Sequence, residues 1–161
     1  MATDEPKPGE GHVWSEVFER TPAEIRDKLE YPSWAGPPDE FRFDGCTASP
    51  DIVFDVNHRI ACAIHDWEYR TPKLMRDGEL DPEAEQRAKA AGAGTESARV
   101  DADWRLYRNL QTCGEPRYIA GAYLRRVLYY SIWFYPYDEG QRPGRAARIG
   151  KWFSRWFRGW R

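Results

Sequence analysis

Helical periodicity is the feature that most restricts the fold of this 161-residue chain. No stretch alternates polar and apolar residues over more than a few positions, whereas apolar residues recur at helical spacing in three segments, 57–70, 96–112 and 116–134. Helix-breaking residues follow these segments: Pro72, Gly114 and Pro136. We therefore expect a mainly α fold, with one helical domain over residues 21–137.

The segments outside these helices carry weaker signals. Residues 1–20 are rich in Pro, Gly and acidic residues, and we expect a flexible arm with little structure of its own. Thr21 to Glu24 form a capping-box sequence, which predicts a short helix over about 22–30. Residues 78–94 are expected to form a surface excursion that is partly helical at best.

The composition predicts neither a membrane-spanning helix nor a Sec signal peptide. The mean hydropathy is −0.81, and no apolar run approaches the roughly 18 residues that a spanning helix needs. Met1 to Pro6 contain neither a basic start nor an apolar stretch, so we expect no Sec signal peptide. The expected locations are then the cytoplasm of a bacterial host, a phage virion, or release by a route other than Sec.

The charges are distributed unevenly along the chain. Residues 140–161 contain seven basic and no acidic side chains, so the rest of the chain holds 17 basic against 26 acidic ones. On a helical projection of residues 148–161, Trp152, Phe153, Trp156, Phe157 and Trp160 occupy one arc and the basic residues another. This pattern predicts that residues 138–161 form an amphipathic tail that lies on an anionic phospholipid membrane. Packing on the domain itself is the main alternative, and nucleic-acid binding is less favoured than either.

A small set of polar residues carries the chemistry. His65 and Tyr69 are four residues apart and share a helix face, and Asp66 is turned about 100° away from them. An imidazole accepts a proton near neutral pH, and carboxylate oxygens bind hard cations. Asp103 on the next long helix is placed to accept a hydrogen bond from His65 and so to orient a base.

These residues stand in a recognisable order. The segment Asp44-Gly45-Cys46-Thr47-Ala48-Ser49-Pro50-Asp51 lies 21 residues before His65, Ala61-Cys62 precedes His65-Asp66-Trp67-Glu68-Tyr69, and Asp103 and Leu106 follow on a later helix. This order resembles the prokaryotic-type phospholipases A2, over residues 44–113. Thr47 and Leu106 depart mildly from the usual Ser and Phe, and a longer insertion separates the two helices.

The resemblance implies a fold and a mechanism. The fold would be an antiparallel helix pair with a Ca²⁺-binding loop, here joined to the C-terminal amphipathic helix. His65 would be the general base, Asp103 would orient it, and Tyr69 would bond to the same carboxylate. Asp44, Gly45 and Asp66 would hold Ca²⁺, and the substrate would be a glycerophospholipid acyl ester. Cys46 and Cys62 stand where this family forms a disulfide.

Two other interpretations remain open. The chain is also similar to uncharacterised phage-associated proteins, because Tyr69-Arg70 and Arg99-Val100-Asp101-Ala102-Asp103 fit their pattern. That similarity implies a non-enzymatic virion or docking protein on the same scaffold. His58, His65-Asp66 and Asp103 also follow the order of metal-dependent phosphohydrolases, although His58 stands unusually close to His65 and is expected to be a surface or helix-start residue.

Overall fold

The mainly α fold predicted from the sequence is confirmed by the computed structural model, which describes residues 11–44, 52–53 and 56–143. Its helices are α1 (Trp14–Arg20), α2 (Ala23–Arg26), α3 (Arg59–Asp77), α4 (Pro82–Ala90), α5 (Glu96–Thr112) and α6 (Arg117–Phe134). Its short strands are β1 (His12–Val13), β2 (Arg42–Phe43), β3 (Ile52–Val53) and β4 (Val56–Asn57). β1 pairs antiparallel with β2, and β3 pairs antiparallel with β4.

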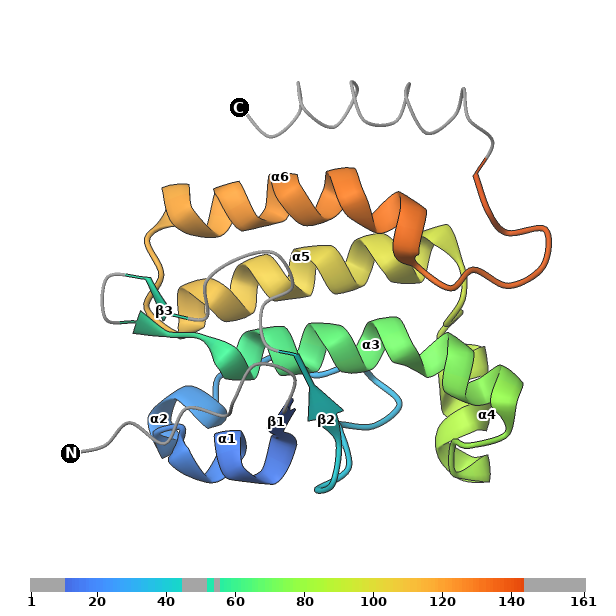
Figure 1. The fold of residues 1–161 in the computed structure, drawn as a ribbon, viewed down its shortest axis with the longest axis horizontal. Helices are drawn as coiled ribbons and strands as arrows, with labels where there is room; N and C mark the ends of the chain where they lie inside the picture. The colour runs from blue at the N-terminus through green and yellow to red at the C-terminus, as the bar shows by residue number, and fades with distance from the viewer. Residues whose placement is uncertain (1–10, 45–51, 54–55, 144–161) are drawn as a thin grey trace.

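The three long helices form the body of the molecule. Figure 1 shows α5 between α3 and α6, with the chain reversing its direction from each of these helices to the next. Each of these helices has a buried alanine (Ala61, Ala102 and Ala120), and such small side chains permit close packing of helices. The stack brings side chains of α3, α5 and α6 together in one buried layer.

The N-terminal segment differs from the expected arm. The structure describes residues 11–20 of that segment, and they form β1 and α1. Trp14 is buried in the main core, and its backbone N–H donates to the Phe41 carbonyl at 2.8 Å. Burial of a large aromatic side chain contributes about 1.5–3 kcal/mol, enough to order a segment whose local sequence is weakly structured.

The capping box at Thr21 does not form. The Thr21 hydroxyl donates instead to the Val17 carbonyl at 2.7 Å, and α2 starts after Pro22 without a side-chain cap. α2 covers only residues 23–26 of the predicted 22–30. The Thr21 hydroxyl therefore bonds to the last turn of α1 and not to the start of α2.

The prediction that Pro72 ends the first long helix is wrong. α3 continues through Pro72 to Asp77 and ends at Gly78, whose φ of +68° suits a residue without a side chain. Pro72 removes the backbone bond to the Glu68 carbonyl, a loss of about 3 kcal/mol in an open helix. Both Pro72 and Met75 are buried, so the packing of the last turns offsets that loss.

Residues 78–94 are more regular than expected. The Asp81 carboxylate caps α4 by accepting from the backbone N–H groups of Glu83 and Ala84, at 3.0 and 3.1 Å, and Pro82 occupies the first helical position. Ala88 is fully buried in a second apolar cluster with Trp34 and Met75. The excursion is therefore a capped helix attached to the end of α3.

Nothing in the described ranges could cross a bilayer, since none of their helices is both long and apolar enough. Most of the predicted tail, residues 144–161, lies outside the part of the chain that the structure describes.

Candidate functional site

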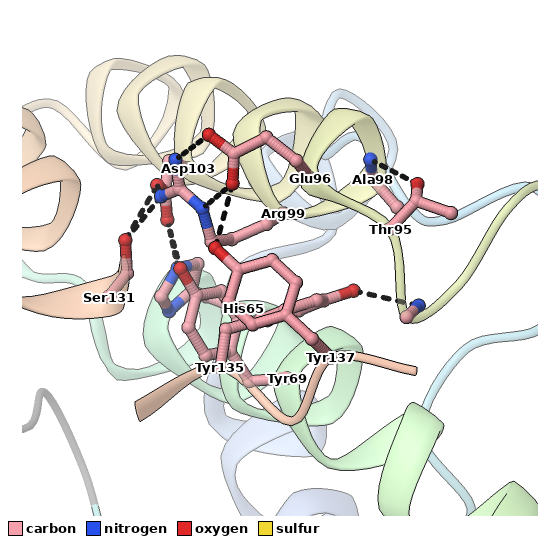
Figure 2. Close-up of polar contacts among 11 residues, drawn as sticks. His65, Tyr69, Thr95, Glu96, Ala98, Arg99, Asp103, Ser131, Tyr135 and Tyr137 are labelled. Carbon is pink, nitrogen blue, oxygen red and sulfur yellow. Dashed lines mark hydrogen bonds and ion pairs between the residues drawn. The ribbon is translucent and has the colours of Figure 1, made fainter. Parts of the chain in front are cut away.

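His65 and Asp103 meet between α3 and α5. The His65 Nε2 lies 3.0 Å from the Asp103 Oδ1, and the Asp103 side chain is completely buried (Figure 2). A carboxylate can only accept, so Nε2–H donates and Nδ1 is the nitrogen that can take a proton. In the described part of the chain Nδ1 has no hydrogen-bond partner, and 12% of the side chain is exposed. The pair thus leaves one nitrogen of a partly exposed imidazole without a partner among the described residues.

Tyr69 reaches the same carboxylate, as the resemblance implied. Its hydroxyl donates to the Asp103 Oδ1 at 2.6 Å, and its ring lies 4.2 Å from the His65 ring, centroid to centroid. Burial, followed by the charge of Asp103, raises the pKa of Tyr69 well above its ordinary value. Tyr69 therefore remains a neutral donor at neutral pH.

The second oxygen of Asp103 has partners that sequence reasoning missed. Arg99 donates to Asp103 Oδ2 at 2.7 Å, and the Ser131 hydroxyl from α6 donates to the same oxygen at 3.2 Å (Figure 2). Arg99 also donates to Ser131. Asp103 is thus held by four donors from α3, α5 and α6, which fixes the orientation of its carboxylate toward His65.

Arg99 is itself embedded in a network. Its guanidinium is 1% exposed and makes a two-point contact with Glu96, at 2.7 and 2.9 Å, while Tyr137 donates to Glu96 at 2.7 Å. Burial opposes the charge of Arg99, but the hydrogen bond to Glu96 and the charge of Asp103 raise its pKa above the ordinary value. The i, i+3 and i, i+4 spacing from Glu96 to Arg99 to Asp103 was the signal in the sequence.

One glycine joins this network to the segment after α6. Gly94 has a φ of +93°, and a Cβ there would lie 2.5 Å from the Asp138 carboxyl group. Its carbonyl accepts from the Asp138 N–H at 3.0 Å, and its N–H donates to the Tyr135 hydroxyl at 3.1 Å. Tyr135 packs edge-on against Tyr69, with ring centroids 5.0 Å apart. The chain after α6 therefore supports the side chains around His65.

Asp44 and Asp66, two of the predicted calcium ligands, lie near one another. The Arg70 Nη2 is 3.8 Å from the Asp44 Oδ2 and 3.7 Å from the Asp66 Oδ2. Burial raises the pKa of Asp66, the charges of His65 and Arg70 oppose that rise, and the Asp44 carboxylate adds to it. The described residues contain no group of three or more His, Cys, Asp or Glu side chains that could hold a metal ion. Gly45, the third predicted ligand, lies outside the described residues.

The expectation that His58 is a surface residue is wrong, although it does stand at the start of α3. Its side chain is fully buried, with Nδ1 2.6 Å from the Glu115 Oε1 and Nε2 3.1 Å from the Tyr123 hydroxyl. Both nitrogens are therefore used away from Asp66 and Asp103, which argues against a phosphohydrolase site. Burial is possible because Glu115 and Tyr123 bring polar partners to the imidazole.

The cysteine predictions are tested only in part. Cys46 lies outside the described residues, so the Cys46–Cys62 disulfide stays a prediction. Cys113 is free and buried, and burial raises the pKa of its thiol to about 12. A thiol with so high a pKa is a poor nucleophile at neutral pH.

Comparison with known protein families, with curated proteins and with solved structures finds no match to this chain. The geometry of the site and the order of the motifs are therefore what indicates a function.

Proposed function

We propose that this protein is a Ca²⁺-dependent phospholipase A2-type hydrolase, which cleaves a glycerophospholipid acyl ester at a membrane surface. The observation that carries the proposal is the His65–Asp103 pair, in which one imidazole nitrogen is bonded to a buried carboxylate and the other has no hydrogen-bond partner among the described residues. An imidazole that is held by a carboxylate can act as the general base that activates a water for attack on an ester.

His65 and Asp103 would have different roles in the reaction. His65 Nδ1 would take the proton from the attacking water, and Asp103 would stabilise the imidazolium that forms. Tyr69, Arg99 and Ser131 hold Asp103, so little reorganisation would be needed when the charge develops. The proton would then pass from His65 to the leaving alcohol.

The charges around Asp66 fit a bound cation. The guanidinium of Arg70 already lies within 4 Å of both Asp44 and Asp66, so these carboxylates attract positive charge to one point. Asp44, Asp66 and the backbone at Gly45 would hold Ca²⁺. The ion would supply Lewis-acid stabilisation of the ester oxyanion.

Arg70 is then a competitor for calcium. It is anchored by a bond from Nη1 to the Arg42 carbonyl at 2.9 Å and lies over the Phe41 ring, 5.4 Å from the centroid. Replacing Arg70 by Gln removes a positive charge beside the two carboxylates, so we expect several-fold tighter Ca²⁺ binding, measured by calorimetry. Lys73→Gln one turn later is the control, because Lys73 pairs with Asp77 instead.

A second candidate has one observation in its favour. The opposite charges of Arg99 and Asp103 neutralise each other. Both side chains are buried and hydrogen-bonded, as in a purely structural ion pair. The same Arg99 and Asp103 carry the similarity to phage-associated proteins. A non-enzymatic virion or docking protein on this scaffold is therefore the alternative.

Fatty-acid release from vesicles of mixed anionic and neutral phospholipid separates the two candidates. The chain is assayed under oxidising conditions with Ca²⁺ and with EDTA, beside His65→Gln and Asp66→Asn. The enzyme requires release that depends on Ca²⁺ and on both side chains. Absence of release, together with a melting temperature that Ca²⁺ does not raise, contradicts the enzyme and favours the alternative.

A further inference from the structure

α6 has two different faces. Its buried face, which includes Ala120, Leu124 and Ser131, packs toward α5 and supplies the Ser131 hydroxyl to Asp103. Its other face is exposed along the whole helix, and Figure 1 shows α6 on the side of α5 away from α3. Exposed positions recur at helical spacing and form what we call the α6 outer face: Arg117, Tyr118, Ala122, Arg125, Arg126, Tyr129, Tyr130, Trp133 and Phe134.

Aromatic side chains dominate the α6 outer face. Phe134 is 77% exposed, Tyr118 is 69% exposed, and Trp133 is 53% exposed. Five aromatic residues are exposed on this one helical face, and aromatic side chains of this size bury about 150–250 Å² each in an interface. This concentration of aromatic surface indicates a binding face.

The charges of this face are of one sign. Arg117, Arg125 and Arg126 are its only ionisable groups apart from tyrosines, and α6 contains no acidic residue. The Arg126 guanidinium lies over the Tyr130 ring, 6.0 Å from the centroid, so cations and rings share one surface. The partner must therefore accept aromatic rings and offer negative charge together.

We propose that the α6 outer face docks on an anionic phospholipid bilayer. Tyr and Trp rings sit at the headgroup level of bilayers, Arg pairs with lipid phosphates, and Phe134, which has no polar tip, would enter the acyl boundary. A second copy of the same face would bring two rows of arginines together, and residues 144–161 are basic as well. The positive charge of the α6 outer face therefore favours an anionic bilayer over a second copy of the chain or residues 144–161.

This docking face deepens the proposed function, because it places the helix that carries Ser131 against the lipid that would be hydrolysed. The binding itself does not require hydrolysis. It can be measured in EDTA and with the His65→Gln variant, so its failure and the failure of the proposed enzyme are distinguishable.

The test is co-sedimentation of the full chain with vesicles at about 0.1 M salt, where surface electrostatics act over about 10 Å. The vesicles contain either phosphatidylcholine alone or phosphatidylcholine with phosphatidylglycerol. We expect binding to the anionic vesicles. Both Tyr118→Ser/Phe134→Ser and Arg125→Glu/Arg126→Glu should weaken it at least tenfold.

The matched control is Arg20→Glu/Lys28→Glu, which makes the same change of charge at exposed residues near α1 and α2. It should bind at least threefold more tightly than the α6 charge variant. Equal binding by wild type and both α6 variants overturns the proposal, since docking would then reside elsewhere. So does preferential binding of a duplex or single-stranded oligonucleotide that displaces the vesicles, or absence of binding to any vesicle.

Discussion

Two histidines near the start of α3 differ in what their ring nitrogens do. His58 uses both of them in the interior, with Glu115 on one side and Tyr123 on the other. Within the described part of the chain, His65 bonds through Nε2 alone, to Asp103, and its side chain is 12% exposed. Each imidazole has a carboxylate and a tyrosine beside it, so these partners alone do not mark a reactive site. The difference is that one His65 nitrogen has no partner among the described residues and that the His65 side chain is partly exposed.

The largest expected effect comes from replacing His65 by Gln. The amide cannot accept a proton from water, so hydrolysis should fall by about 10²- to 10⁴-fold. The side chain is at the edge of the core and Gln can still donate to Asp103, so the free energy of unfolding should change by less than about 1 kcal/mol. Vesicle hydrolysis and urea unfolding give the two values.

His58→Gln is the matched variant for that experiment. It should hydrolyse phospholipid at the wild-type rate per folded molecule. A loss of activity comparable to that of His65→Gln would assign chemistry to the wrong histidine, and our distinction between them would fail.

Replacing His58 by Ala should have the largest effect on stability. It leaves the Glu115 carboxylate buried without the imidazole, and breaking a buried pair in this way costs about 3–5 kcal/mol. Urea unfolding measures the loss. The double variant His58→Ala/Glu115→Gln should recover part of it, because the charge is then removed. Additive losses would mean that the two side chains do not interact.

Much of the fold followed from local patterns. The positions of α3, α5 and α6 were predictable because apolar spacing and the following Gly or Pro act within a few residues. The continuation of α3 through Pro72 was not, because it depends on packing of Pro72 and Met75 against distant elements. The structure of residues 11–20 likewise depends on Trp14 meeting Phe41.

The candidate site divides in the same way. His65 and Tyr69 were placed on one face by their spacing, and the motif order pointed to Asp103. Ser131 could not be found, because it lies 28 residues from Asp103 and is a common residue in a helix. The burial of His58 was missed because its carboxylate partner lies 57 residues away. Contacts at such separations require the tertiary fold.

An effect of intermediate size is expected in the pH dependence of stability, from a carboxyl group near His65. Glu68 lies on α3 near His65 and pairs with Arg105, yet burial raises its pKa from 4.5 to about 7. Between these values the folded state binds more protons than the unfolded state, so this group makes stability fall as pH rises. Its contribution is fully present below about pH 4.5 and is lost as the pH rises through about 7.

Glu68→Gln removes this titration. The free energy of unfolding of the variant relative to wild type should therefore increase from pH 4.5 to pH 8, by up to about 3 kcal/mol. Urea unfolding at several pH values measures the difference. Parallel stability curves for Glu68→Gln and wild type would contradict the raised pKa.

The smallest effects come from the two tyrosines, and they should fall on different observables. Tyr69→Phe removes a donor from Asp103, and a hydrogen bond to a charged group is worth about 1.5–3 kcal/mol, so we expect at least a tenfold lower hydrolysis rate. Tyr123→Phe removes the hydrogen-bond partner of His58 Nε2 and should cost about 1 kcal/mol of stability without changing the rate per folded molecule. Rates and urea unfolding are measured on both variants. If Tyr123→Phe slowed hydrolysis as much as Tyr69→Phe, the two imidazoles would belong to one coupled network, and the division between a structural and a reactive histidine would have to be abandoned.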